Sequence, residues 1–331
     1  MQSIFAYCLS KPWLLAAMLI IGLVLLVKGA DWLVDGASAV AKRFGISDLV
    51  IGLTVVAFGT SMPEFVGNMV SVAKDSTDLA LTNILGSNII NTFVILGMTA
   101  VVYPITSQKR SRDFDIPLSI IAGVLVFAFV TIQSPLGEVG RGISRIGGIV
   151  LLLMFTYFLY NTFRHAKDHP DEAEEQTVKP MGPGVAIVLI LCGLAGLVVG
   201  GEMIVRSAVQ IATDLGVSEA IIGLTIVALG TSLPELATSV IAAVKKNCDI
   251  ALGNVIGSNI FNVFFVLGTS AVVRPLPSYD GIELDAWVAA IGSMMVWMFV
   301  KTNRQRQVKR WGGALLLLVY AGYLTYRLIS L

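Results

Sequence analysis

Long apolar runs separated by short polar stretches dominate the chain. A helix needs about 20 mostly apolar residues to cross a hydrocarbon core of about 30 Å, so each such run predicts a membrane-spanning helix. Ten runs meet this length: 13–41, 49–72, 79–102, 116–132, 143–163, 184–212, 220–244, 250–273, 284–300 and 311–329. The pattern therefore predicts an all-α integral membrane protein with ten transmembrane helices.

Composition supports the membrane class. Apolar residues make up 56% of the 331 residues, only 14% are charged, and the mean hydropathy is +0.82. A soluble protein of this size would carry far more charge. The net charge of +1 comes with no basic block that would follow a phosphate backbone, so no nucleic-acid partner is expected. Three widely spaced cysteines form neither a metal-ligand pattern nor a disulfide framework and are interpreted as small buried apolar residues.

The polar part of the chain occurs twice. Gly-Thr-Ser-Met-Pro-Glu at 59–64 returns as Gly-Thr-Ser-Leu-Pro-Glu at 230–235, and each copy is followed by Gly-Ser-Asn-Ile-x-Asn, at 86–91 and 257–262. Aligning 45–97 with 216–268 at a constant offset of 171 gives 26 identities in 53 positions. We therefore divide the chain into a first five-helix repeat (1–163), a polar linker (164–182) and a second five-helix repeat (183–331).

Lys and Arg predict the orientation. With the N-terminus outside, the inner side holds 15 of these residues and the outer side six. Both termini are then expected outside the cell membrane, with linker 164–182 in the cytoplasm. Because five spans is an odd number, the two repeats must have opposite orientations, which is the inverted-repeat architecture of many secondary transporters.

A carboxylate lies inside an apolar segment of each repeat, at Glu64 and Glu235. Such a group costs about 2.5–3.5 kcal/mol on insertion scales, and a bound cation is the simplest way to offset that cost. Pro63 and Pro234 lack the amide hydrogen that would bond the carbonyl four residues back, so each is expected to break its helix and free backbone carbonyls. Such carbonyls are tolerated in a membrane only where they line a cavity or find a ligand.

The polar residues around each carboxylate fall on shared helix faces. Thr60 and Glu64 are four residues apart, as are Ser87 and Asn91, and a spacing of four places side chains on one face. The second copy repeats this spacing with Thr231, Glu235, Ser258 and Asn262.

These residues together supply carboxylates, hydroxyls, amides and carbonyls. Such hard oxygen ligands suit Na⁺ or Ca²⁺, and neither His nor Cys is present to favour zinc or copper. Two carboxylates would be neutralised by one Ca²⁺ or by two Na⁺, which gives a basis for competition at one site. Small residues can also serve close helix packing, and a lone Glu can pair with Lys. Neither alternative explains a Glu after Thr-Ser-x-Pro in both halves.

Two further groups of charges have simpler interpretations. Asp31 and Glu202 are related by the same offset, and helical spacing predicts that Lys28 and Arg206 neutralise them. A direct ligand role is the alternative. The linker holds His165, His169 and an acidic cluster that we expect to solvate the loop rather than sense cations. Its acidic residues are Asp168, Asp171, Glu172, Glu174 and Glu175.

At these motifs the sequence resembles the cation/calcium exchanger superfamily, and it looks most like the short prokaryotic sodium/calcium exchangers. The resemblance covers essentially the whole chain. It implies alternating access, with the first and sixth helices sliding against the remaining eight. It also implies a ligand set of side chains and backbone carbonyls: Glu64, Glu235, Thr60, Thr231, Ser61, Ser232, Ser87, Ser258, Asn91, Asn262, Ala57 and Ala228.

The expected function is secondary active exchange of Ca²⁺ for Na⁺, with no enzymatic activity, no resident cofactor and no obligate protein partner. Some relatives carry Asp where this chain has Asn262, so the uncharged amide argues against K⁺ co-transport. A Ca²⁺/H⁺ antiporter on the same scaffold is the alternative, although proton-coupled relatives tend to show Gly-Asn-x-x-Glu and here Gly253-Asn254 is followed by Val-Ile-Gly. A cation channel is the alternative from a different class, and the inverted symmetry argues against it because a channel would not need that symmetry.

Overall fold

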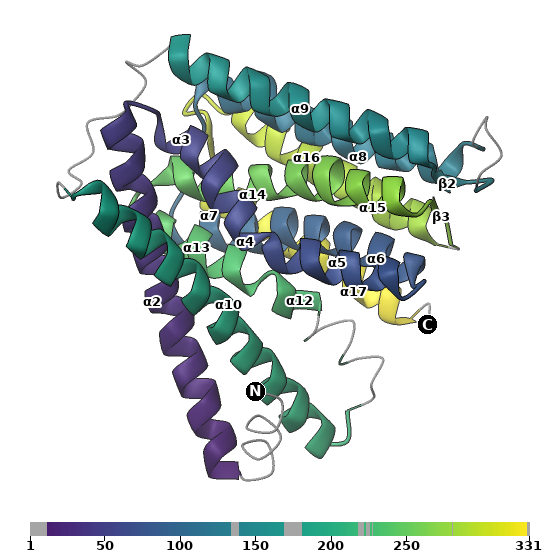
Figure 1. Ribbon diagram of the computed structural model, residues 1–331, viewed down its shortest axis with the longest axis horizontal. Helices are drawn as coiled ribbons and strands as arrows, with labels where there is room; N and C mark the ends of the chain where they lie inside the picture. The colour runs from purple at the N-terminus through teal and green to yellow at the C-terminus, as the bar shows by residue number, and fades with distance from the viewer. Residues whose placement is uncertain are drawn as a thin grey trace.

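The computed structural model describes residues 12–133, 139–168, 181–217, 222, 226, 228–279 and 281–329, and these are almost entirely helical (Figure 1). Within them, eight helices are long and apolar enough to cross a membrane, and one bent pair adds a ninth span. The prediction of a helical, multi-span membrane protein is confirmed, although the described residues also contain four two-residue strands. The seventh predicted span, 220–244, begins among residues outside the described ranges, so the count of ten stays a prediction.

Several predicted spans of the first half are divided into shorter elements, and three elements of this half are π-helical. In chain order they are α2 (Pro12–Phe44), α3 (Asp48–Ile51), η1 (Gly52–Val56), α4 (Ala57–Thr60), α5 (Met62–Ala73), α6 (Thr77–Ile89), η2 (Ile90–Ile95), α7 (Leu96–Val102), β1 (Ile105–Thr106), η3 (Ser111–Asp115), α8 (Ile116–Thr131), β2 (Gly142–Ile143) and α9 (Arg145–Asp168).

The second half follows with closely matching bounds. Its elements are α10 (Pro183–Asp214), α12 (Ala228–Thr231), α13 (Leu233–Val244), α14 (Cys248–Ile260), η6 (Phe261–Leu267), α15 (Gly268–Val273), β3 (Leu276–Pro277), α16 (Ile282–Thr302), β4 (Gln307–Val308) and α17 (Arg310–Ile329). The bounds of α4, α5 and α6 reappear at α12, α13 and α14 after the offset of 171, so the duplicated sequence folds into duplicated elements.

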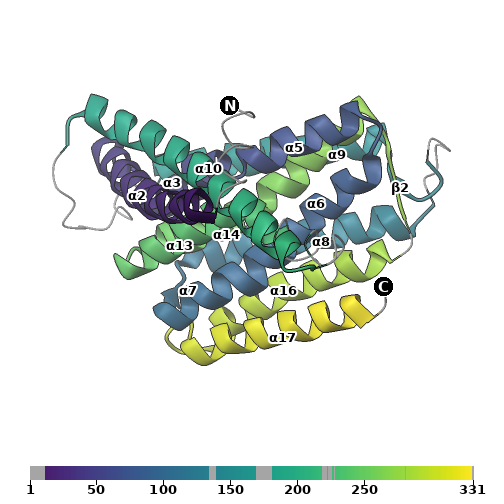
Figure 2. The same ribbon diagram turned by 90° about the horizontal axis from the view of Figure 1, so that it is seen from below.

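The two longest helices, α2 and α10, pack against each other and extend away from the other helices (Figures 1 and 2). Glycines permit the close approach. A Cβ on Gly29 would lie 2.8 Å from the Gly193 carbonyl oxygen, and one on Gly200 would lie 2.7 Å from the Gly22 carbonyl oxygen. Small residues let backbones approach in this way in membranes. The contact makes α2 and α10 one packing unit.

Helix α2 begins and ends where local signals place its termini. Pro12 is its first residue, a position where a missing amide hydrogen costs nothing. At the other end Gly45 adopts φ +63°, and the Ile46 amide donates to the Ala41 carbonyl at 3.0 Å. Left-handed glycine is the usual residue just past a helix end.

Helix α14 forms the centre of the molecule, since every one of its 13 residues is buried. It packs against η1 and α13. A Cβ on Gly253 would lie 3.0 Å from the Leu49 carbonyl oxygen, so the two backbones are nearly in contact there. The polar motif 257–262 is therefore enclosed by protein on all sides.

Two short antiparallel strand pairs join the halves. Strand β1 pairs with β4, and β2 pairs with β3. Gly142 in β2 has φ +133°, and a Cβ there would lie 2.2 Å from the Leu276 carbonyl oxygen. Only glycine fits this position.

The linker begins later than its sequence suggests. Residues 164–168 continue α9, and the Arg164 guanidinium lies 3.6 Å from the Asp168 carboxylate one turn away. Spacing of i to i+4 favours such pairs on a helix surface. The other acidic residues of the predicted cluster (Asp171, Glu172, Glu174 and Glu175) and His169 lie outside the described residues.

Candidate ion-binding site

Two helix breaks meet in the middle of the molecule. The chain turns out of the helical conformation at Ser61 (φ −86°, ψ 7°) and at Ser232 (φ −93°, ψ 8°). Pro63 and Pro234 follow at the start of α5 and α13, where proline is tolerated. The segments before and after Ser61 are bent by 45°. The breaks expected from the two prolines are therefore present.

Each break places a glutamate in the first turn of the following helix. Glu64 and Glu235 are both 0% exposed. The Ser87 hydroxyl donates to Glu64 Oε1 at 3.1 Å, and the Ser61 hydroxyl donates to Glu235 Oε1 at 2.8 Å. The second of these bonds joins the first half of the sequence to the second.

The two glutamates share one polar cluster. Ser87 Oγ, which contacts Glu64, also lies 3.0 Å from Ser232 Oγ, and Ser232 belongs to the break that carries Glu235. Ser61, Ser87 and Ser232 are each at most 2% exposed. Hydrogen bonds thus connect five predicted site residues from the two halves of the sequence: Ser61, Glu64, Ser87, Ser232 and Glu235.

Several buried oxygens of the predicted site residues have no hydrogen-bond partner in the structure. They are Glu64 Oε2, Glu235 Oε2, Asn91 Oδ1, Asn262 Oδ1 and Ser258 Oγ. A buried polar atom without a partner costs free energy comparable to a lost hydrogen bond. Oxygen is the ligand type that Na⁺ and Ca²⁺ prefer. The donor set therefore fits a hard cation.

Asn91 and Asn262 both lie in π-helical segments, η2 and η6. Such segments are rare and occur frequently at functional sites. Asn262 Nδ2 donates to Asn88 Oδ1 at 3.1 Å, whereas neither side-chain atom of Asn91 has a partner. Of the two equivalent side-chain amides, that of Asn262 thus makes one hydrogen bond within the protein and that of Asn91 makes none.

The remaining predicted residues lie in α4 and α12, the two short helices that precede the breaks. Thr60 donates its hydroxyl to Asn254 Oδ1 at 3.0 Å, and the Ala57 carbonyl accepts the Ser61 amide at 3.0 Å. Thr231 ends α12 and is half-buried, and Ala228 begins the same helix.

Sequence reasoning missed a second layer of asparagines. Asn254 donates to the Glu235 carbonyl at 3.2 Å and to Ser239 Oγ at 2.9 Å, so it supports the helix that carries Glu235. Asn88 Nδ2 donates to the Asn259 carbonyl at 3.3 Å, and Asn259 Nδ2 donates to Thr92 Oγ1 at 2.8 Å. The available signal was the repeat itself, because Asn83 and Asn254, like Asn88 and Asn259, are related by the offset of 171.

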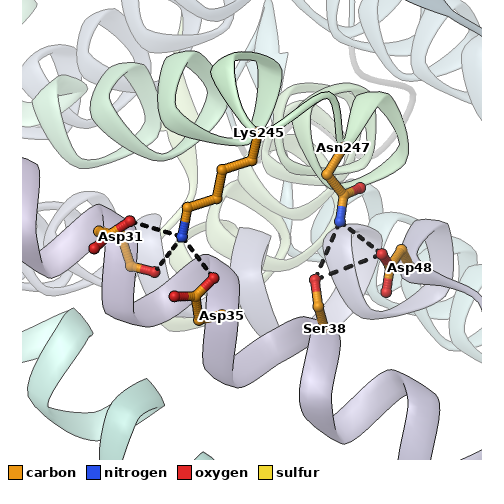
Figure 3. Close-up of polar contacts among 6 residues, drawn as sticks. All are labelled: Asp31, Asp35, Ser38, Asp48, Lys245 and Asn247. Atoms are coloured by element: carbon orange, nitrogen blue, oxygen red, sulfur yellow. Dashed lines mark hydrogen bonds and ion pairs between the residues drawn. The ribbon is translucent and has the colours of Figure 1, made fainter. Parts of the chain in front are cut away.

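The charged pair on α10 is confirmed, whereas the one on α2 is wrong. Arg206 Nη2 lies 2.6 Å from Glu202 Oε1, as the spacing predicted. Asp31 instead pairs across helices with Lys245, whose Nζ lies 2.7 Å from Asp31 Oδ1 (Figure 3). Packing of α13 against α2 brings Lys245 within reach, a tertiary contact that sequence spacing does not encode.

The charge of the cluster comes from two carboxylates alone. No group of three or more His, Cys, Asp or Glu side chains suited to a metal occurs in the described ranges. Two carboxylates surrounded by neutral oxygens can exchange one divalent for two monovalent cations without a change in net charge. The site therefore has the chemistry of reversible hard-cation binding.

A cavity of 370 Å³, here called the vestibule, leads to this cluster from one side. Its wall follows α6 from exposed Thr82 through half-buried Asn83 and Gly86 to buried Ser87. Thr231 from α12, Asp285 from α16 and Arg327 from α17 also line the vestibule. Ser87 thus links the vestibule to Glu64.

The equivalent route in the other half is closed. A Cβ added to Gly86 would have no heavy atom within 4 Å. A Cβ added to its counterpart Gly257 would lie 2.8 Å from both the Ala57 Cβ and the Leu53 carbonyl oxygen. Leu79 is 61% exposed and its counterpart Ile250 is 0% exposed. Among the described residues, the vestibule therefore approaches the cluster from one side, whereas helix packing fills the equivalent position in the other half.

Comparison with known proteins agrees with the geometry. A family model described as "Sodium/calcium exchanger protein" matches residues 14–164 and again 185–329. The putative antiporter CaxA of Alkalimonas amylolytica is 37% identical over 309 residues, which cover 92% of this chain and 95% of that protein. The sodium/calcium exchanger MaX1 of Methanosarcina acetivorans is 30% identical, over 92% of this chain and 96% of that one.

Solved structures show the same fold. The sodium-calcium exchanger NCX_Mj, soaked with Na⁺ and Sr²⁺, superposes with a TM-score of 0.81 at 32% identity, covering 95% of this chain and 99% of that chain. Two thirds of the sequence differ between the two chains while the helix arrangement is retained.

Proposed function

Since the chain belongs to the sodium/calcium exchanger protein family, we propose that it is a secondary antiporter that exchanges Ca²⁺ for Na⁺ across the membrane. The observation that carries the proposal is the pair Glu64 and Glu235. Both are fully buried, both keep a carboxylate oxygen without a protein partner, and serines join them into one cluster. Burying two carboxylates so close together is costly unless cations bind there.

The ligands that the donor set supports are the predicted ones. Glu64 and Glu235 bind either ion. Serine and threonine oxygens and the amides Asn91 and Asn262 complete the coordination. Ca²⁺ and Na⁺ are bound as cargo, and the protein needs no resident cofactor.

One-sided access supports alternating access as the mechanism. In the proposed architecture the chain forms ten transmembrane helices in two inverted five-helix repeats, 1–163 and 183–331. Inverted repeats can exchange conformations, so the closed route beside Gly257 opens when the vestibule beside Gly86 closes. The long α2–α10 pair moves relative to the other helices as this occurs.

The proposed orientation places the vestibule on the outside. The 15-to-six distribution of Lys and Arg puts both termini outside and residues 164–182 in the cytoplasm of a multi-pass plasma-membrane protein. Lys74 and Arg327 are at the vestibule end, which this distribution assigns to the outer face.

Transport in sealed vesicles tests the coupling ion. Purified protein is reconstituted, and uptake of labelled Ca²⁺ is measured under an outward Na⁺ gradient, an outward K⁺ gradient or a pH gradient. The Na⁺ gradient is expected to drive uptake, and external Na⁺ is expected to compete with Ca²⁺. Protein-free vesicles treated identically provide the baseline.

A proton-coupled mechanism predicts the opposite result. Uptake driven by a pH gradient in the absence of Na⁺, with no response when Na⁺ is added, would replace Na⁺/Ca²⁺ exchange by Ca²⁺/H⁺ exchange. No Ca²⁺ uptake under any gradient would reject calcium exchange altogether.

A further inference from the structure

A charged contact joins α2 to the core at the end of the molecule opposite the vestibule. Lys245 caps the C-terminus of α13 and points at α2 (Figure 3). Its Nζ lies 2.7 Å from Asp31 Oδ1 and 2.5 Å from Asp35 Oδ1, and it donates to the Asp31 carbonyl at 3.1 Å. One lysine thus serves two carboxylates.

The spacing of the two carboxylates makes this contact sensitive to the position of α2. Asp31 and Asp35 are four residues apart, which is about 6 Å along a helix axis. Lys245 reaches both carboxylates only while α2 keeps its present position along its own axis relative to α13. A displacement of one turn would leave one pair or neither.

A second polar contact holds α2 at the same end. Asn247 Nδ2 donates to Asp48 Oδ2 at 2.6 Å and to Ser38 Oγ at 3.1 Å. Ser38 lies on α2 about one turn beyond Asp35, and Asp48 begins α3. The contact therefore adds to the hold on α2 (Figure 3).

The offset of 171 identifies the equivalent positions in the other half. Lys245 corresponds to Lys74 at the end of α5, Asp31 to Glu202, and Asp35 to Arg206. The described residues hold no ion pair with Lys74, and Glu202 is paired with Arg206 on its own helix. The contact is thus made at the closed end and absent at the open end.

We propose that Asp31, Asp35 and Lys245 form a latch that holds the α2–α10 pair in the conformation with the vestibule open, and that Lys74 and Glu202 form its weaker counterpart in the opposite conformation. Arg206 makes the second latch weaker, because it repels Lys74 and competes for Glu202. The inference rests on the proposed alternating access. It adds the residues that set the balance between the two conformations.

The latch residues are positioning residues, since none of them touches the ion-binding cluster. Their side chains are 28–44% exposed, so the ion pairs are partly screened. Pairs of this kind shift an equilibrium by about two- to fivefold. This is the expected effect on the ratio of the two conformations.

The test measures that ratio without any ion gradient. In a variant with its own cysteines replaced, Ile250→Cys reports the closed end and Leu79→Cys reports the vestibule end. Labelling by a small maleimide in nanodiscs is expected to be slow at 250 and fast at 79. Lys245→Met, and separately Asp31→Asn with Asp35→Asn, should raise the labelling rate at 250 by about two- to fivefold.

Matched variants separate the latch from local disorder. Lys245→Arg keeps the charge and should restore the parental rate. Lys246→Asn removes a neighbouring lysine that has no ion pair within the described ranges, and its φ of 62° suits Asn, so the rate should not change. Arg206→Asp gives the second latch two carboxylates and should raise labelling at 250 from the far end of the molecule.

Two outcomes would overturn the proposal. One is an unchanged rate at 250 in Lys245→Met. The other is an equal rise in Lys246→Asn together with no rise in Arg206→Asp, which would indicate fraying of the loop. Calcium uptake by the parent protein is measured separately, so a failure of the proposed exchange and a failure of the latch give different results.

Discussion

The central residues of this protein are two buried glutamates, which hydrogen bonds from serines connect across the two halves of the sequence. Glu235 accepts a hydrogen bond from Ser61, 174 residues away, and Ser87 lies between Glu64 and Ser232. Each carboxylate keeps one oxygen without a protein partner. The proposed function of these two residues therefore depends on the negative charge of their carboxylates rather than on the shape of their side chains.

Neutralising either glutamate should therefore abolish transport. Glu64→Gln and Glu235→Gln keep the side-chain size and its hydrogen bond but remove the charge that balances the ion. Labelled Ca²⁺ uptake is expected to fall to the level of protein-free vesicles. Glu283→Gln is the control, because Glu283 pairs with Arg141 outside the cluster, and it should transport normally. Uptake near the parental rate in either site variant would remove that residue from the site.

Adding charge at Asn262 should change the cation dependence. Asn262 is 0% exposed, and its Oδ1 has no partner, so Asn262→Asp places a third carboxylate among the ligands. We expect the competition between Na⁺ and Ca²⁺ to change and a K⁺ requirement to arise. Initial uptake rates measured against each monovalent ion test this, and identical profiles for parent and variant would contradict it.

At the scale of elements, glycines and prolines decide how the helices meet. The breaks at Ser61 and Ser232 present the glutamates, and the glycines of α2 and α10 join these helices into one unit. A broken helix exposes polar groups inside the membrane, and a smooth glycine face allows close backbone contact.

Filling the α2–α10 contact should destabilise the protein. Gly29→Leu inserts a side chain where a Cβ already lies 2.8 Å from the Gly193 carbonyl oxygen. Overpacking of this kind costs about 1–3 kcal/mol. The thermal midpoint in detergent should fall, whereas Gly322→Leu, which has no heavy atom within 4 Å of its Cβ, should change it little. Equal midpoints for the two variants would show that α2 and α10 do not depend on this contact.

For the whole molecule, the two ends of the bundle differ. The vestibule reaches Ser87 at one end, and tight packing of α14 closes the other. The proposed latch residues Asp31, Asp35 and Lys245 lie at the closed end, so under the proposed mechanism their ion pairs would link the position of α2–α10 to access.

The proposed orientation can be tested with single cysteines. Gln133 and Gln305 are both exposed and lie at the predicted outer and inner ends. In intact cells, an impermeant maleimide should label Gln133→Cys but not Gln305→Cys, because the bilayer separates them. A permeant maleimide should label both. The reverse labelling pattern would invert the topology.

Much of the architecture was predictable, because membrane insertion depends on local hydropathy. The span 13–41 became α2 (Pro12–Phe44), and 311–329 became α17 (Arg310–Ile329). The offset of 171 also anticipated that α5 and α6 would recur as α13 and α14. Glu64 and Glu235 could be singled out because a carboxylate in an apolar run requires an explanation wherever the chain folds. The complete ligand set was implied only by the resemblance to the exchanger superfamily and stays a prediction.

Other features depended on tertiary structure. The partner of Asp31 proved to be Lys245 and not Lys28, because helix packing brings distant charges closer than helical spacing does. The sequence pattern predicted continuous spans at Asn91 and Asn262 and did not indicate the π-helical segments that the structure has there. Nor does the sequence say which route is open, since Gly86 and Gly257 occupy equivalent motifs. That difference arises from how the helices pack, because two repeats that share the same motifs can adopt different arrangements in one molecule.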